Sequence, residues 1–283
     1  ICEVAYMGYL TPATSILPSD FWKEPVDYHW EPPADVKRSF DLAKANQILD
    51  EAGYKDTDGD GIREYEGKPI TLRLWGDAEI PANSPTGKLM VGWFQDIGLK
   101  IKYTTEDYGR ITDHMYNYVD GEFCPDWDLL LGYWGGDYDP GFLLSVYTTA
   151  EIENWNDAGW SNREYDRLYR AQDAAMDPQE RLQMIRRMQE IWYEQVAAIA
   201  FAYPRDLEVY NTADWDGWVR MPAGNGTALN IWTYLDIEPR QAGDEGGGAN
   251  VTALVVVLVV AAAVVAVLTV LLLRRRSARR VEQ

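Results

Sequence analysis

Three aspartates spaced two residues apart form the clearest metal-binding pattern in this chain. Asp56, Asp58 and Asp60 are followed by Gly61. Carboxylates at positions 1, 3 and 5, with a glycine at position 6, match the start of an EF-hand calcium loop. Position 12 holds Gly67 instead of glutamate, which argues against a complete EF-hand. Two interpretations stay open: an abbreviated loop holding a structural calcium ion, or a tight turn in which Asp and Gly satisfy the backbone.

Two pairs of aspartates raise the question of acid–base catalysis. Asp126 and Asp128, and Asp137 and Asp139, are each two residues apart. Such pairs could imitate the two carboxylates of a glycosidase, but so short a spacing brackets a sugar only in a special geometry. The chain has two histidines, and neither a nucleophile elbow, a zinc-protease motif nor a phosphate loop is present. We therefore expect no catalytic residues and no enzyme.

Alternating helices and strands must position these side chains. Apolar periodicity and end signals predict helices over 41–52, 86–97, 108–119, 163–176 and 178–196. Alternation and short apolar runs predict strands over 70–75, 99–103, 128–134, 198–203 and 207–211. Asp41 and Asp177 are suited to cap the first and last helices, and Gly53 suits the end of the first. The pattern predicts an α/β fold in which helices flank a mixed sheet.

The charge balance excludes two classes of partner. The chain has 26 basic and 45 acidic residues; without the five arginines and one glutamate after residue 250, 21 and 44 remain, a net charge of −23. So negative a surface repels nucleic acid and anionic lipid headgroups. Cys2 and Cys124 are the only cysteines, and the sequence leaves open whether they form a disulfide.

A long uncharged segment lies near the C-terminus. Val251–Leu273 spans 23 residues without a charge, and five arginines follow within residues 274–283. As a helix the segment would be about 35 Å long, enough for a bilayer core of about 30 Å. Arginines collect on the cytoplasmic side of membrane spans. We expect a single-pass membrane anchor with the ligand domain outside and the C-terminus inside. Because an outer domain needs an export signal, we also expect residues before Ile1.

Several ordered motifs make the chain resemble the dipeptide/oligopeptide family of extracellular solute-binding proteins, family 5 of the ABC importers. The motifs are Gly8–Pro18, Phe40–Ala45, Leu49–Tyr54, Asp56–Gly61, Gly67–Pro69, Asp126–Pro140, Pro178–Trp192 and Ile199–Tyr203. The resemblance covers residues 1–238. It implies a periplasmic-binding-protein-like bilobal α/β fold with mostly the second lobe present. A C-terminal anchor resembles the arrangement in some archaeal members.

The resemblance also implies a division of the chain. The segments are a hinge-proximal segment (1–39), an α/β ligand-binding lobe (40–212), a return segment to the first lobe (213–240), a Gly-rich acidic linker (241–250), a transmembrane helix (251–273) and a basic cytoplasmic tail (274–283).

The resemblance implies that four residues of the motif Asp126–Pro140, which we call the central motif, contact the ligand. In peptide-binding relatives an aspartate matching Asp137 pairs with the ligand's α-ammonium group; otherwise Asp137 caps a turn. Trp134 and Tyr133 would cover a peptide backbone or stack on a sugar, or else pack in the core. Tyr138, beside Asp137, completes the set.

The function implied is capture of peptides by lobe closure and delivery to an ABC permease and ATPase. This chain would then need no cofactor beyond a structural calcium ion, and it would have no nucleic-acid partner. The alternatives are an oligosaccharide-binding protein of the same fold, a surface receptor without a transport role, and a surface glycosidase.

Overall fold

The computed structural model describes residues 1–19, 26–136, 139–205, 207–221, 223 and 226–240. The chain divides into two compact units, 1–205 and 206–283, which we describe separately. In the described ranges, no helix is long and apolar enough to cross a bilayer. The predicted linker, membrane segment Val251–Leu273 and tail lie outside the described residues.

A three-stranded sheet organises one half of the first unit. The strands are β4 (Thr71–Asp77), β5 (Lys100–Glu106) and β8 (Leu129–Leu131), in the order β5-β4-β8. Leu74 of β4 pairs with Tyr103 on one side and Leu129 on the other, and both pairings are parallel. The predicted mixed sheet is therefore wrong for these strands. A helix follows β4 and another follows β5, and such crossovers return the chain to the end of the sheet where the preceding strand began, so that the next strand runs parallel.

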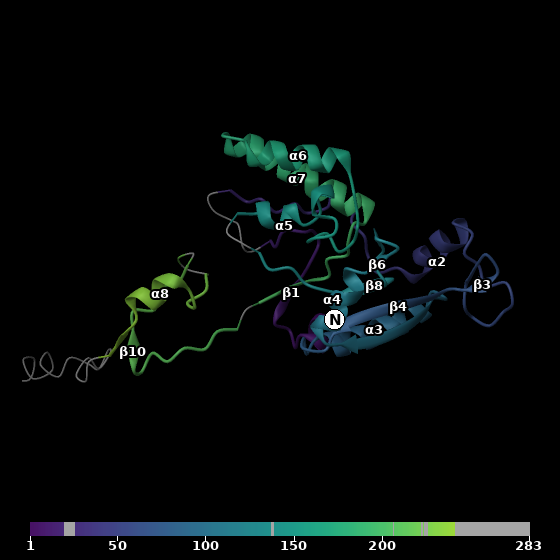
Figure 1. Ribbon diagram of the computed structural model, residues 1–283, viewed down its shortest axis with the longest axis horizontal. Helices are drawn as coiled ribbons and strands as arrows, with labels where there is room; N and C mark the ends of the chain where they lie inside the picture. Colours follow the sequence, from purple (N-terminus) through teal and green to yellow (C-terminus); the bar gives the residue numbers. More distant parts are fainter. Residues whose placement is uncertain (20–25, 137–138, 206, 222, 224–225, 241–283) are drawn as a thin grey trace, which may run out of the picture. The chain divides into compact units, whose positions relative to one another are not determined.

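Helices contact both faces of this sheet (Figure 1). The helix α3 (Asn83–Gln95) packs Met90, Val91 and Phe94 against the buried residues of the strands. The helix α4 (Tyr108–Met115) lies on the other face, where His114 stacks on Trp75 with 4.3 Å between ring centroids. Trp75 is adjacent to Leu74 in β4, and neighbouring strand residues point to opposite faces.

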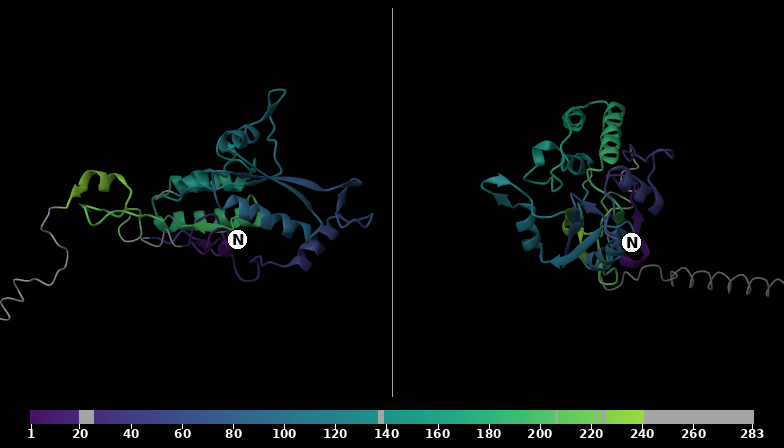
Figure 2. Two further views of the ribbon diagram at one scale, coloured as in Figure 1. Left: turned by 90° about the horizontal axis from the view of Figure 1, so that it is seen from below. Right: turned by 90° about the vertical axis from the view of Figure 1, so that its right-hand side faces the viewer.

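A helical layer forms the second half of this unit. The helices α6 (Arg163–Asp173) and α7 (Pro178–Gln195) lie side by side, and α5 (Gly141–Ser145) packs against α6 (Figures 1 and 2). Their core contains Ile16, Leu17, Leu143, Leu144, Tyr165, Leu168, Ile185, Met188, Ile191 and Trp192. The N-terminal segment thus contributes to a core otherwise built from residues 143–192.

The predicted N-terminal caps of two helices agree with the structure. Asp41 accepts a hydrogen bond from Lys44 N at 2.9 Å at the start of α2 (Leu42–Glu51). Asp177 accepts from the backbone of Gln179 at 2.7 Å at the start of α7. Gly53, with φ +90°, follows α2 in the left-handed conformation that glycine favours.

The predicted helix over 108–119 ends too late. After α4, β6 (Tyr118–Val119) and β7 (Glu122–Phe123) form an antiparallel hairpin. Asp120 and Gly121 connect them, with φ values of 53° and 86°. Positive φ at both central residues is typical of a type I′ turn, for which Asp-Gly is a preferred sequence.

The chain ends of the first unit also differ from prediction. A short helix α1 (Cys2–Ala5) precedes β1 (Leu10–Pro12), and β1 pairs antiparallel with β9 (Ala202–Pro204). The predicted strand over 198–203 is therefore shorter and later than expected. Residues 207–211 form no strand, so that prediction is wrong.

The remaining elements are short. In the first unit β2 (Glu64–Tyr65) pairs with β3 (Lys68–Pro69), and η1 (Thr149–Glu151) is a 3₁₀ turn. In the second unit β10 (Trp215–Asp216) pairs with β11 (Glu238–Pro239). The helix α8 (Ile231–Asp236) lies between them in sequence and is capped by the Asn230 side chain.

Candidate ligand-binding site

The central motif leaves the sheet at the carboxyl end of β8. Leu131, the last residue of β8, is buried in the sheet core, and Tyr133 and Trp134 follow within three residues. The carboxyl ends of parallel strands are the usual place for ligand contacts in open α/β sheets. Strand pairing thus places Tyr133 and Trp134 at the carboxyl end of the sheet, where a ligand could contact them.

Two aromatic rings pack against that of Trp134. Its ring lies 5.4 Å from that of Trp155 and 6.3 Å from that of Phe142, with both pairs edge-to-face. Phe142 and Trp155 are 6.2 Å apart. We call these three residues the aromatic cluster. Trp134 is half-buried against the helical core, whereas Tyr133 is 73% exposed.

The aromatic cluster combines packing with access to solvent. Phe142 and Trp155 are exposed, so part of the cluster can contact a ligand. Aromatic faces cover peptide backbone or sugar rings equally well. The sequence indicated Trp134, but only the fold reveals Phe142 and Trp155 as its partners.

Asp139 is held by an arginine of α7. Arg181 donates from Nη1 and Nη2 to the two carboxylate oxygens, each at 2.7 Å. Asp139 also accepts from Gly141 N at 2.7 Å, at the start of α5. The hydrogen bonds from Arg181 lower the pKa of Asp139 despite its partial burial. Asp137 and Tyr138, the predicted ligand residues beside it, lie outside the described residues.

The other aspartate pair is neutralised by one arginine. Arg73 donates to Asp128 from its backbone N at 2.7 Å and from Nε at 3.0 Å, and it also bonds Asp126. These hydrogen bonds lower the pKa of both carboxyl groups. A glycosidase acid needs a raised pKa. The pair therefore has the electrostatics of a structural ion pair between β4 and the segment before β8.

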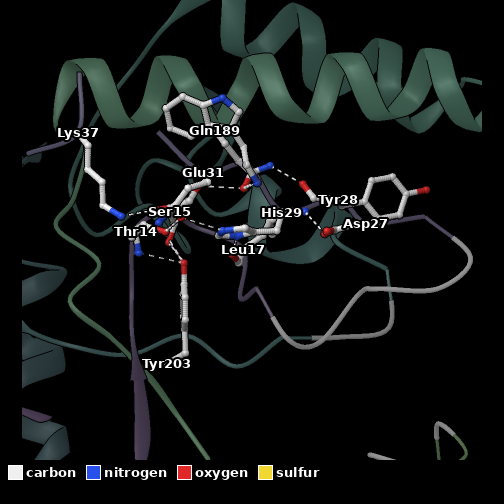
Figure 3. Close-up of polar contacts among 11 residues, drawn as sticks. Thr14, Ser15, Leu17, Asp27, Tyr28, His29, Glu31, Lys37, Gln189 and Tyr203 are labelled. Carbon is white, nitrogen blue, oxygen red and sulfur yellow. Dashed lines mark hydrogen bonds and ion pairs between the residues drawn. The ribbon is translucent and has the colours of Figure 1, made fainter. Parts of the chain in front are cut away.

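A polar network joins the N-terminal segment to α7 and β9 (Figure 3). Tyr203 donates its hydroxyl to Ser15 O at 2.7 Å and accepts from Ser15 N at 3.0 Å. Gln189 is fully buried; its Oε1 accepts from Ser15 Oγ at 2.9 Å, and its Nε2 donates to Tyr28 O at 2.8 Å. We call this set of contacts the Gln189 network. No sequence motif indicated it, because its members lie far apart along the chain.

Glu31 forms the exposed edge of this network. Burial opposes its ionisation, but hydrogen bonds from Lys37, Thr14 and His29 outweigh that effect and lower its pKa to about 2. Thr14 Oγ1 donates at 2.6 Å, and His29 Nε2 lies 3.3 Å away. The network thus fastens residues 14–17 and 27–37 next to the β1–β9 pair.

The three spaced aspartates form a turn joined by a fourth carboxylate. Asp56 accepts from Gly59 N at 2.7 Å, as a tight turn requires. One ligand atom from each of Asp56, Asp58, Asp60 and Glu64 lies within 4.8 Å of the others. The spacing of the three aspartates did not indicate Glu64, although this residue occupies the ninth position of the loop, which can also contribute a calcium ligand.

Both cysteines are free thiols. Cys2 lies in α1 and Cys124 directly follows β7. The structure thus answers the question that the sequence left open.

Comparison with known families gives one extended match. The model of the family described as "Bacterial extracellular solute-binding proteins, family 5 Middle" matches residues 1–154, more than half of the 283 residues. The match includes Trp134 and Phe142 of the aromatic cluster.

Individual relatives and solved structures agree with this match. The dipeptide-binding protein of Pseudomonas aeruginosa is 28% identical over 170 residues, covering 58% of this chain and 28% of the relative. The oligopeptide-binding protein AppA of Bacillus subtilis, solved with a nonapeptide, matches with a TM-score of 0.65 and 18% identity, covering 85% of this chain and 44% of that one. An oligopeptide-binding protein of Thermotoga maritima, solved with mannohexaose bound, gives a TM-score of 0.63, 20% identity and coverages of 85% and 47%. The chain thus spans less than half the length of each of these proteins.

Proposed function

Because the chain belongs to the family-5 bacterial extracellular solute-binding proteins, we propose that it takes part in capturing peptides for an ABC importer. The observation that carries this proposal is the family match over residues 1–154, which contains the central motif at the carboxyl end of β8. The family consists of solute-binding proteins, which also supports a binding role over a catalytic one. Permease and ATPase subunits would be the partners, and they would hydrolyse ATP.

Peptide recognition would combine one charge with a largely apolar surface. Asp137 would pair with the α-ammonium group, since a partly desolvated carboxylate makes a strong charge-assisted hydrogen bond. Trp134, with Tyr133 and Tyr138 nearby, would cover the peptide backbone. Contacts to backbone and terminus, with few to side chains, would bind peptides with little sequence preference. Asp139 is engaged by Arg181 and so is the weaker candidate for this contact.

Capture would proceed by closure of two lobes about a hinge. The β1–β9 pair and the Gln189 network fasten residues 10–15 and 28–30 to α7 and to the end of the first unit, at Arg205. In the proposal, residues 1–39 are hinge-proximal, 40–212 form the ligand-binding lobe, and 213–240 return to the other lobe. Ligand contacts made only in the closed arrangement would drive this motion.

Val251–Leu273 would anchor the protein, with residues 241–250 as its extracellular linker and the arginines of 274–283 inside. The test is extraction of membranes with alkaline carbonate. The full chain should stay in the pellet, whereas a chain ending at residue 250 should be released. Release of both would reject the anchor without affecting the binding proposal.

The binding test is calorimetry of the full chain in detergent with di- to octapeptides. We expect a tripeptide to bind, N-acetylation of that peptide to weaken binding at least about tenfold, and Asp137→Asn to match that loss. Asp113→Asn, at an exposed residue of α4, is the control and should bind as the parent does. Equal binding of acetylated and free peptides would reject the ammonium contact.

An oligosaccharide is the second candidate ligand. The aromatic cluster supports it, as does the structural similarity to a protein solved with mannohexaose. Calorimetry with mannohexaose and cellohexaose tests it in the same buffer. Binding of a sugar without any peptide, abolished by Trp134→Ala, would replace the peptide proposal with this one.

A further inference from the structure

We propose that the loop joining α2 to β2 binds one calcium ion through the carboxylates of Asp56, Asp58, Asp60 and Glu64. One oxygen from each lies within 4.8 Å of the others. Four carboxylates this close repel one another unless a cation lies between them. Calcium takes six to eight oxygen ligands and tolerates irregular geometry, so a carboxylate-rich loop suits it.

Glu64 is the residue that points to an ion. Its side chain is 8% exposed, and its Oε2 accepts from Thr57 N at 2.7 Å and Thr57 Oγ1 at 2.9 Å. Its Oε1 is buried, and among the residues that the structure describes it has no hydrogen-bond partner. A buried carboxylate oxygen without a partner is strongly unfavourable unless a cation or a hydrogen-bond donor pairs with it. A calcium ion among the four carboxylates would supply it.

The nearest guanidinium group does not fill this role. Arg63 adjoins Glu64, but its Nη1 bonds Asp50 at 2.6 Å and its Nε donates to Ile97 O at 2.8 Å. Adjacent residues of an extended segment point to opposite sides. Arg63 is thus committed to the α2 side, and Glu64 faces the loop.

The backbone hydrogen bonds of the aspartates leave coordination sites free. Asp58 accepts from Asp60 N at 3.1 Å, and Asp60 accepts from Ile62 N at 2.7 Å. Asp58 and Asp60 each use one oxygen in these bonds, whereas Asp56 accepts with both, from Gly59 N and Gly61 N. A carboxylate has about four acceptor sites, so each aspartate keeps sites for an ion. The turn and the ion are therefore compatible. Glu64, at position 9, would supply the glutamate that position 12 lacks.

The test is calorimetric titration of the full chain, in detergent and freed of divalent ions, with CaCl2 and separately with MgCl2. We expect one calcium site with a Kd of the order of 10⁻⁴ M, as in extracellular modules. The melting temperature should rise with calcium concentration, because calcium would bind only the folded loop. Loss of an outer-shell partner alone typically costs ten- to a hundredfold in metal affinity, so Glu64→Gln should weaken calcium binding at least about tenfold.

Two further variants guard against misfolding as an explanation. Asp58→Asn removes an exposed ligand without touching the buried Glu64, and it should also weaken calcium binding at least about tenfold. Asp35→Asn, an exposed aspartate outside the loop, should bind calcium as the parent chain does. Absence of a calcium signal in the parent chain, equal affinity for magnesium, or unchanged calcium binding in both loop variants would overturn the proposal. None of these outcomes bears on peptide capture.

Discussion

Arg181 of α7 holds Asp139 through two parallel hydrogen bonds of 2.7 Å, one from each terminal nitrogen of its guanidinium group. Two-point pairing is stronger and more directional than a single contact. It fastens the end of the central motif to the longest helix of the first unit. The stability of this segment should therefore depend on the charge of Asp139.

We expect Asp139→Asn to lower the free energy of unfolding by about 1 kcal/mol at pH 7, because the Asp139 side chain is 58% exposed and solvent screens the pair. The folded-state pKa of Asp139 is lowered. The stabilisation is therefore complete above the unfolded pKa of about 3.9 and disappears as the pH falls through the folded value. Urea denaturation at pH 7 and pH 3 measures both values. Asp173→Asn, at an exposed residue at the end of α6, is the control; a loss that persists unchanged at pH 3 would contradict the ion-pair explanation.

The Gln189 network predicts a large effect from an apolar replacement. Gln189→Leu keeps the side-chain volume but leaves Ser15 Oγ, Trp30 N and Tyr28 O without their partner. We expect the free energy of unfolding, measured by urea denaturation, to fall by about 2–4 kcal/mol. Gln179→Leu, on the exposed face of the same helix, should stay within about 0.5 kcal/mol of the parent. Similar effects of the two substitutions would show that the network contributes little.

Two glycines of α3 should respond to alanine in opposite directions. A Cβ at Gly87 would lie 2.2 Å from the Tyr103 ring, whereas a Cβ at Gly92 meets nothing within 4 Å. Gly87→Ala should lower the free energy of unfolding by about 2 kcal/mol, because the added methyl group would overlap the Tyr103 ring. Gly92→Ala should stabilise by about 0.5–1 kcal/mol, since alanine favours helix. Thermal unfolding of both variants tests the close packing of α3 on β5.

The cause of the Gly87 effect can be isolated with a second substitution. Tyr103→Val removes the ring that a Cβ at Gly87 would meet. In the Tyr103→Val background, the cost of Gly87→Ala should disappear. A cost that remains would locate the strain elsewhere.

Asp157 should make the protein less stable as the pH rises. Burial raises its pKa to about 7, and its Oδ1 has no hydrogen-bond partner within the described part of the chain. Between about pH 4 and 7 the folded state then binds more protons than the unfolded state, so stability falls as the pH increases. Asp157→Asn should remove this pH-dependent loss of stability. Its free energy of unfolding should exceed that of the parent by about 2 kcal/mol at pH 8 and differ little from it at pH 4.

Urea denaturation from pH 4 to pH 8 measures this difference. Asp113→Asn, at an exposed residue of α4, provides the control and should track the parent at every pH. A gain from Asp157→Asn that is constant across the range would point to packing in place of titration.

Signals confined to a few neighbouring residues were enough to predict several elements. The cap of α2 by Asp41 and the alternation of β4 both follow from such local patterns, and the structure agrees. The hairpin at 118–123 could also have been predicted, because Asp120-Gly121 is a turn signal. The apolar spacing of the preceding helix continues into this segment and led to the prediction of a longer helix. The family resemblance was likewise carried by local motifs, and the family match agrees with it.

Contacts between distant segments could not be predicted in this way. Arg73 forms hydrogen bonds with Asp126 and Asp128, which lie more than 50 residues away in the sequence. The two aspartates, considered from the sequence as a catalytic acid pair, are therefore part of an ion-pair network. Apolar periodicity predicted the helix α2, yet Ile48, one of its apolar residues, is 53% exposed. The periodicity of apolar residues shows which residues share one face of a helix. Whether that face is buried against another element depends on the tertiary packing.

By itself, the sequence determined the local elements, the net negative charge and the uncharged segment Val251–Leu273, because each depends on residues close together in the chain. The tertiary structure alone decided that Trp134 meets Trp155, that Arg181 holds Asp139, and that Glu64 joins the three aspartates. The first two contacts need segments more than 20 residues apart to meet. The third depends on the turn that folds β2 back against the loop. These relationships arise when burial and hydrogen bonding are satisfied together, and no local pattern encodes that solution.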